Sequence, residues 1–199
     1  MLKGLFMSIS LNLSIINIGV NLCYTNTMTN YDAIMPDGSC IFCKIARKEI
    51  DPMGKGIIYE DDKYLAWLSP HPNTLGFTAV IPKKHFGSDC LAMPDDELKE
   101  FIVIAKKVAK ILENYFEDVG RVGLIMEGTG IDHAHIKLSP MHGTEHFKKG
   151  EWRQYPSSVD TIYEKYNGYI SSNDGPEADL GEIENLAEKI REKYENNIS

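Results

Sequence analysis

The chain has 199 residues, of which 43% are hydrophobic and 25% are charged. These proportions are typical of a globular protein and exclude a collagen-like, fully disordered or polytopic membrane chain. The 21 Lys+Arg and 29 Asp+Glu residues give a net charge of −8, of which −5 falls in residues 174–195. An acidic chain is unsuited to coating nucleic acid, since that affinity comes from neutralising phosphates, but one local site can still bind a small phosphate compound.

Residues 1–27 differ from the rest of the chain, because Lys3 is followed by an apolar-leaning run with no other charge. One interpretation is a secretory signal peptide. The other is an extension, or a start assigned too early with Met28 as the initiator. Asparagines interrupt the run, which makes it too polar and too short to cross a membrane. We therefore expect residues 1–36 to be an N-terminal extension of a cytoplasmic protein that has no membrane partner.

Residues 37–150 alternate strand-like segments with one long helical pattern, and we expect them to form the main domain. A short helix is predicted over 39–47 and strands over 57–59, 64–68, 77–81, 122–126 and 133–138. A long helix is predicted over 95–116, with a core-facing apolar stripe that includes Phe101, Ile102 and Ala105. Strand pairs joined by short turns, with one long helix between them, indicate an α+β domain on a five-stranded, mainly antiparallel sheet. The remaining residues, 151–199, are expected to be a C-terminal extension that ends in an amphipathic, acidic helix over 183–194.

The strongest chemical feature is the strand that begins at His133. Residues two apart on a strand point to the same face, so His133, His135 and Lys137 share one face while the residues between them face the core. A neutral imidazole can attack phosphorus, and a neighbouring ammonium can hold phosphate oxygens. The alternative is an edge strand with a solvated polar face.

A second feature is the pair Cys40 and Cys43, which opens the predicted short helix as a CxxC motif. In such a chain the motif indicates a metal or redox site more often than a structural disulfide. The surrounding pattern is not the βαβ arrangement that the redox interpretation requires. A zinc site needs two more ligands, for which His85 and His133 are the candidates.

Three segments together resemble the histidine triad (HIT) family. They are Ala-Trp-Leu-Ser-Pro-His-Pro at 66–72, Gly-Phe-Thr-Ala-Val-Ile-Pro-Lys-Lys-His at 76–85, and His-Ala-His-Ile-Lys-Leu at 133–138. The resemblance implies a HIT-like fold, a homodimer and a covalent nucleotidyl-histidine formed at the α-phosphate of a nucleotide. It assigns the nucleophile to His135 and the first position of the catalytic triad to His133. In the CxxC subset it assigns zinc to Cys40, Cys43, His85 and His133. Such a closed tetrahedral site is structural.

Lys137 departs from the family pattern, which has histidine at the third triad position, and we interpret it as a phosphate clamp. Ser69 is matched to the family's ribose-binding aspartate. The loop before the triad is short, and Thr129 or the backbone near Gly130 substitutes in contacting the α-phosphate. Trp67 is a candidate for flanking the base, with core packing as the alternative.

The sequence therefore predicts a zinc-containing hydrolase of a nucleoside phosphoramidate or dinucleoside polyphosphate. A nucleotidyltransferase or phosphorylase, and a non-catalytic nucleotide-binding interaction protein, are the alternatives.

Overall fold

The computed structural model describes residues 38–52, 55–153 and 178–196, and the expected extension 1–36 lies outside them. The elements in chain order are α1 (Ile41–Ala46), β1 (Ile57–Glu60), β2 (Tyr64–Leu68), β3 (Thr78–Pro82), η2 (Cys90–Ala92), α2 (Asp95–Tyr115), β4 (Val122–Ile125), β5 (Ile136–Pro140), η3 (Glu145–Lys149) and α3 (Leu180–Asn196). The strands form one sheet in the order β1-β2-β3-β5-β4, and every neighbouring pair is antiparallel. This is the predicted α+β fold with a short N-terminal helix and a long second helix.

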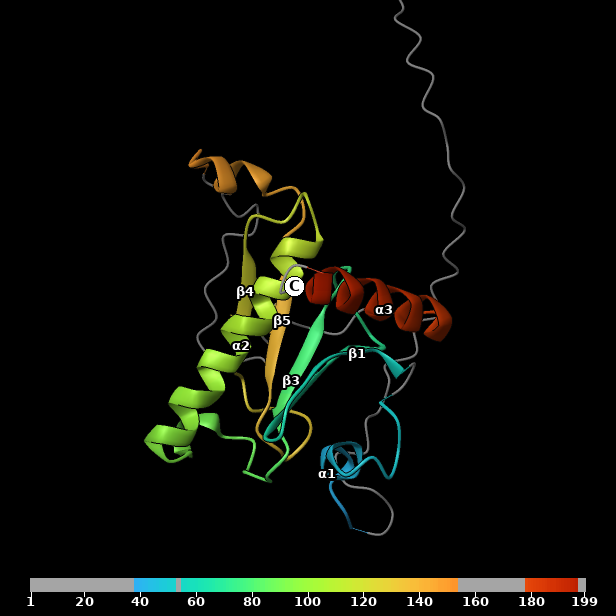
Figure 1. Ribbon diagram of the computed structural model, residues 1–199. Coiled ribbons are helices and arrows are strands. Elements are labelled where there is room, and N and C mark those ends of the chain that lie inside the picture. The colour runs from blue at the N-terminus through green and yellow to red at the C-terminus, as the bar shows by residue number, and fades with distance from the viewer. Residues whose placement is uncertain (1–37, 53–54, 154–177, 197–199) are drawn as a thin grey trace, which may run out of the picture.

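The long helix α2 crosses one face of the sheet (Figure 1). Three acidic residues, Asp95, Asp96 and Glu97, occupy its first turn, where negative charge interacts favourably with the helix dipole. Its buried side chains recur at helical spacing and pack into the main core against the strands; they are Phe101, Ala105, Val108, Ile111 and Leu112. Ile102, which the apolar pattern places in this stripe, is instead 40% exposed.

The C-terminal helix α3 lies beside α2 and contacts β1 (Figure 1). Its residues Ile183, Ala187 and Ile190 are buried in the same core as α2. Arg191 donates a hydrogen bond to the carbonyl oxygen of Ile57, and Lys193 Nζ donates one of 2.8 Å to Tyr115 O. The domain boundary at residue 150 stays a prediction. Helix α3 lies beyond that boundary in the sequence, yet its apolar side chains pack into the main core. Within the described ranges, no helix has the length and apolarity to cross a bilayer.

The opposite face of the sheet carries a smaller apolar cluster beneath α1. Ile45 of α1 packs there against Leu65 and Trp67 of β2 and Ile81 of β3. Successive residues of β2 point to opposite faces of the sheet. Tyr64, Ala66 and Leu68 therefore belong to the main core, and the residues between them belong to the smaller cluster. This second face is the one on which the candidate site lies.

Strand β5 begins at Ile136, three residues later than the sequence pattern predicts. Val80 pairs with Ile136, so a continued antiparallel pairing would set Pro82 opposite Ala134. Pro82 has no N–H to donate to the ladder. The chain uses other bonds there: Ala134 N donates to Phe86 O at 2.8 Å. The predicted alternation still holds before the strand, since Ala134 joins Ile136 in the main core.

Candidate active site and metal centre

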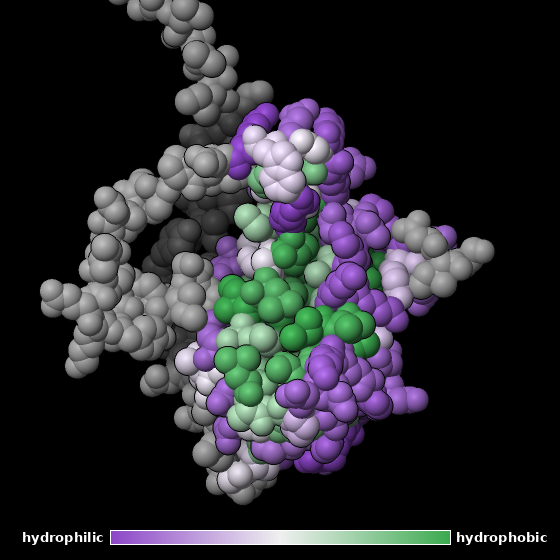
Figure 2. All heavy atoms as spheres, turned by 90° about the vertical axis from the view of Figure 1, so that its left-hand side faces the viewer, coloured by the Kyte–Doolittle hydropathy of each residue, from purple (hydrophilic) through white to green (hydrophobic). Residues whose placement is uncertain are grey.

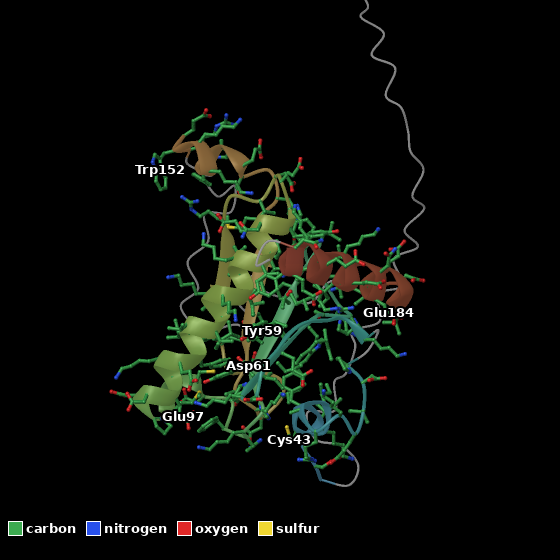
Figure 3. All side chains as sticks on the ribbon, viewed as in Figure 1. Cys43, Tyr59, Asp61, Glu97, Trp152 and Glu184 are labelled. Carbon is green, nitrogen blue, oxygen red and sulfur yellow. The ribbon has the colours of Figure 1, made fainter. Side chains whose placement is uncertain are left out.

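Two cysteines and two histidines from three separate parts of the chain meet beside α1. Cys40 and Cys43 are three residues apart at the start of this helix, a spacing that places their side chains on one side. Figure 3 shows Cys43 on the side of α1 that faces the strands. His85 follows β3 and His133 precedes β5. One ligand atom from each of the four residues lies within 4.8 Å of all the others.

The separations within this cluster suit a tetrahedral metal ion. His133 Nδ1 lies 3.4 Å from Cys40 Sγ and 3.3 Å from His85 Nδ1, and Cys43 Sγ lies 3.3 Å from His85 Nδ1. Zinc bonds of about 2.0–2.3 Å at tetrahedral angles place ligand atoms roughly 3.3–3.8 Å apart. The Cys₂His₂ donor set and its spacing therefore fit zinc with little movement of the chain.

A hydrogen bond to the backbone determines which ring nitrogen of His133 carries the proton and which has the lone pair. His133 Nε2 lies 2.8 Å from Pro82 O, and a carbonyl only accepts, so Nε2 carries the proton. Burial lowers the pKa of His133 to about 4, despite the opposing effect of the Pro82 hydrogen bond. The ring is therefore neutral near pH 7, with its Nδ1 lone pair directed at the sulfurs, as a metal ligand requires.

The ring of His135 is also oriented by a hydrogen bond to a backbone carbonyl. It is 5% exposed, and its Nδ1 lies 2.8 Å from the carbonyl oxygen of His133, to which it donates. In the neutral ring this leaves the lone pair on Nε2. The Phe42 ring of α1 meets the His135 ring edge-on, with centroids 5.8 Å apart. His135 is therefore a buried, oriented imidazole with its nucleophilic nitrogen defined.

Lys137 lies on the same face of the sheet as His135. Cross-strand pairing puts Trp67, Ala79, Lys137 and Ile125 in one row across four strands, and paired residues point to the same side. The ammonium of Lys137 forms an ion pair with the Glu127 carboxylate. Sequence reasoning missed Glu127, which stands just beyond the end of β4.

The four predicted nucleotide contacts are distributed unevenly around His135. Trp67 is buried, and its ring packs edge-on against Phe42 with centroids 5.2 Å apart. Ser69 follows β2 on the side of Lys137 away from His135, and its Oγ accepts a hydrogen bond from His71 N at 3.2 Å. Thr129 and Gly130 are exposed in the loop after β4. The structure thus brings His135, Lys137 and Trp67 to one face, whereas Ser69 follows the end of β2 and the other two residues lie in an exposed loop.

Comparison with known proteins identifies the family. The HIT domain model matches residues 52–142. An uncharacterized HIT-like protein of Methanocaldococcus jannaschii is 37% identical over 110 residues, which cover 52% of this chain and 79% of that protein. The chain therefore belongs to the histidine triad family.

Two further relatives bear on fold and chemistry. An adenosine 5′-monophosphoramidase of Saccharomyces cerevisiae is 35% identical over 109 residues, covering 52% of this chain and 63% of that protein. The crystal structure of a hypothetical histidine triad nucleotide-binding protein from Sulfolobus tokodaii matches with a TM-score of 0.57 and 27% identity. The match covers 79% of this chain and 93% of that one. The α+β fold with its open five-stranded sheet is thus the fold of its structural relatives.

Proposed function

We propose that this protein hydrolyses a nucleotide at its α-phosphate through a covalent intermediate on His135. The observation that carries the proposal is the bond from His135 Nδ1 to the His133 carbonyl. That bond leaves the Nε2 lone pair for attack on phosphorus and supports the positive charge that the ring gains when the bond forms. As the P–Nε2 bond forms, the bond from phosphorus to the amine or phosphate leaving group breaks. Water then attacks the phosphorus, the P–Nε2 bond breaks, and the nucleoside monophosphate leaves.

The substrate class is a nucleoside phosphoramidate or a dinucleoside polyphosphate. The yeast relative, described as an adenosine 5′-monophosphoramidase, supports the first of these. His135→Ala is expected to abolish turnover of both classes, while Ser39→Ala, an exchange before α1, is expected to retain it. Unchanged turnover by His135→Ala would refute the proposal.

Product analysis separates the proposed hydrolase from the two alternatives. A transferase would pass the nucleotide to inorganic phosphate or a sugar phosphate, so its products would change when those acceptors are added. A non-catalytic binding protein would bind adenosine monophosphate tightly in calorimetry and turn over no analogue. We expect nucleoside monophosphate as the product with and without added phosphate.

We further propose that Cys40, Cys43, His85 and His133 hold a structural zinc ion. Zinc bound there would supply a fixed crosslink between α1 and the segment that carries His135, and bound structural zinc contributes on the order of 10 kcal/mol to folding. The Pro82 hydrogen bond to His133 Nε2 orients that ring as a ligand in advance. Because both cysteines must be reduced, the site suits the cytoplasm.

A homodimer is the third proposal. Strand β4 is at the edge of the sheet, and along its outer side no other described strand is paired. Leu124 of β4 is 41% exposed and Val103 of α2 is 61% exposed. Figure 2 shows a hydrophobic area on the face of the molecule that presents these two elements. An open strand edge beside exposed apolar side chains is the kind of surface that a second copy covers.

A further inference from the structure

The ion pair between Lys137 and Glu127 is unusual for its degree of burial. The Glu127 side chain is 6% exposed and that of Lys137 is 21% exposed. Other ion pairs of the described residues are more open: in the Lys63–Glu100 pair the two side chains are 63% and 40% exposed. Burying a carboxylate costs free energy, which an ion pair of good geometry offsets in part. The ammonium of Lys137 therefore helps to stabilise the buried Glu127 carboxylate.

The position of this pair is equally informative. Lys137 pairs with Ile125 across β4 and β5, and Glu127 is two residues beyond Ile125. Because β4 and β5 are antiparallel, the step from Ile125 to Glu127 runs in the same direction in space as the step from Lys137 to His135. Glu127 therefore lies beside the His135 end of β5. A buried carboxylate beside a phosphate-binding face repels the ligand unless its charge is neutralised. Glu127 is therefore not itself a phosphate contact, and it forms an ion pair with Lys137.

Glu127 restricts where the ammonium of Lys137 can go. A lysine side chain has about 2 kcal/mol of rotamer entropy and can swing widely, whereas one held by a buried carboxylate cannot. Lys137 has three N–H donors, so the bond to Glu127 does not use all of them, and Lys137 lies on the same face of the sheet as His135. A fixed N–H donor near the reacting phosphorus can give its proton to the leaving group.

Building on the proposed hydrolysis at His135, we propose that Lys137 protonates the leaving group and that Glu127 is its positioning residue. In the first step His135 Nε2 bonds to phosphorus and the bond to the leaving atom breaks. The electron pair goes to that atom, which takes a proton from Lys137 Nζ. In the second step water bonds to phosphorus, the P–Nε2 bond breaks, and the water proton returns to Lys137 Nζ.

The test compares two substrates of one nucleoside. Adenosine 5′-phosphoramidate has a leaving nitrogen that needs a proton, whereas the 4-nitrophenyl ester of adenosine monophosphate releases a stable anion. Lys137→Met is expected to lower kcat/KM for the phosphoramidate by about 10²–10⁴-fold, the range typical of general acids. The ester is expected to lose less than about tenfold. Equal losses for both substrates would overturn the acid role.

Glu127→Gln tests the positioning role with nearly the same side-chain shape. We expect kcat for the phosphoramidate to fall at least about tenfold with KM little changed, and Glu127→Asp to restore part of the loss. The matched control is Glu100→Gln, the same chemical change in the exposed pair with Lys63, which should leave kcat unchanged. Unchanged kcat in Glu127→Gln, or equal loss in the control, would overturn this role.

A leaving-group series on the wild-type enzyme keeps the idea testable if a variant does not fold. With an acid in place, kcat/KM should vary little as phenyl ester leaving groups become more basic; a steep decline would contradict the proposal. Failure of the function itself has a different signature. In that case wild type turns over neither substrate, or His135→Ala retains activity.

Discussion

Replacing Ile190 by alanine tests whether α3 is an integral part of the folded domain. Ile190 is 0% exposed and lies in the main core with Ile183 and Ala187. The change removes three carbon atoms, and at about 0.8 kcal/mol for each buried CH₂ this amounts to roughly 2.4 kcal/mol. A residual cavity adds to it, so we expect a loss of about 3 kcal/mol, inside the range of about 2–5 kcal/mol for such substitutions.

The assay is urea unfolding of the full chain at one protein concentration, followed by tryptophan fluorescence, because Trp67 is buried. The control is Glu184→Ala, on the exposed side of the same helix (Figure 3), which should stay within about 0.5 kcal/mol of wild type. A loss below about 1 kcal/mol for Ile190→Ala would show that α3 contributes little to the folded state. The reasoning about the core would then be wrong.

Three further predictions concern metal, pH and assembly. Elemental analysis should find one zinc per chain in wild type and less in Cys43→Ser, with a lower Tm; metal-free wild type of equal Tm would contradict the site. Hydrogen bonding to Lys83 chiefly lowers the pKa of Glu60 from 4.5. Glu60→Gln should therefore cost up to about 1 kcal/mol at pH 7, and this difference should vanish as the pH falls through that lowered pKa. A difference that persists at pH 2 would refute the assignment. Sedimentation should give two chains per particle for wild type and one for Val103→Asp combined with Leu124→Asp; an unchanged mass would exclude that interface.

The fold could be predicted largely because the strand and helix patterns are local. The strand at 64–68 and the helix beginning at Asp95 have the predicted bounds within a residue. The buried residues of α2 were less predictable, because the elements that pack against this helix determine which of its sides is buried. Helix α3 packs beside α2, and Ile111 is buried in their shared core, whereas Ile102 is exposed.

The candidate metal cluster could also be predicted, because the chain has only 4 cysteines and 6 histidines and the spacing of the CxxC motif is informative. The structure brings Cys40, Cys43, His85 and His133 together as that reasoning requires. Their roles as ligands stay a prediction until metal is measured.

Glu127 could not be found from the sequence. It is separated from Lys137 by the loop between β4 and β5, and the pairing register across a loop of this length depends on tertiary contacts. The start of β5 was misjudged for a related reason. Pro82 on the neighbouring strand has no N–H, so the ladder does not extend to His133, although the side-chain alternation does.

The most direct measurement is the mass of the covalent intermediate. The wild-type protein is mixed with adenosine 5′-phosphoramidate, quenched during turnover and digested, and the peptides are sequenced by mass spectrometry. We expect the adenylyl group on His135, and no adduct in His135→Ala. Turnover by His135→Ala at the wild-type rate, or an adduct on another residue, would contradict the central claim that His135 is the nucleophile.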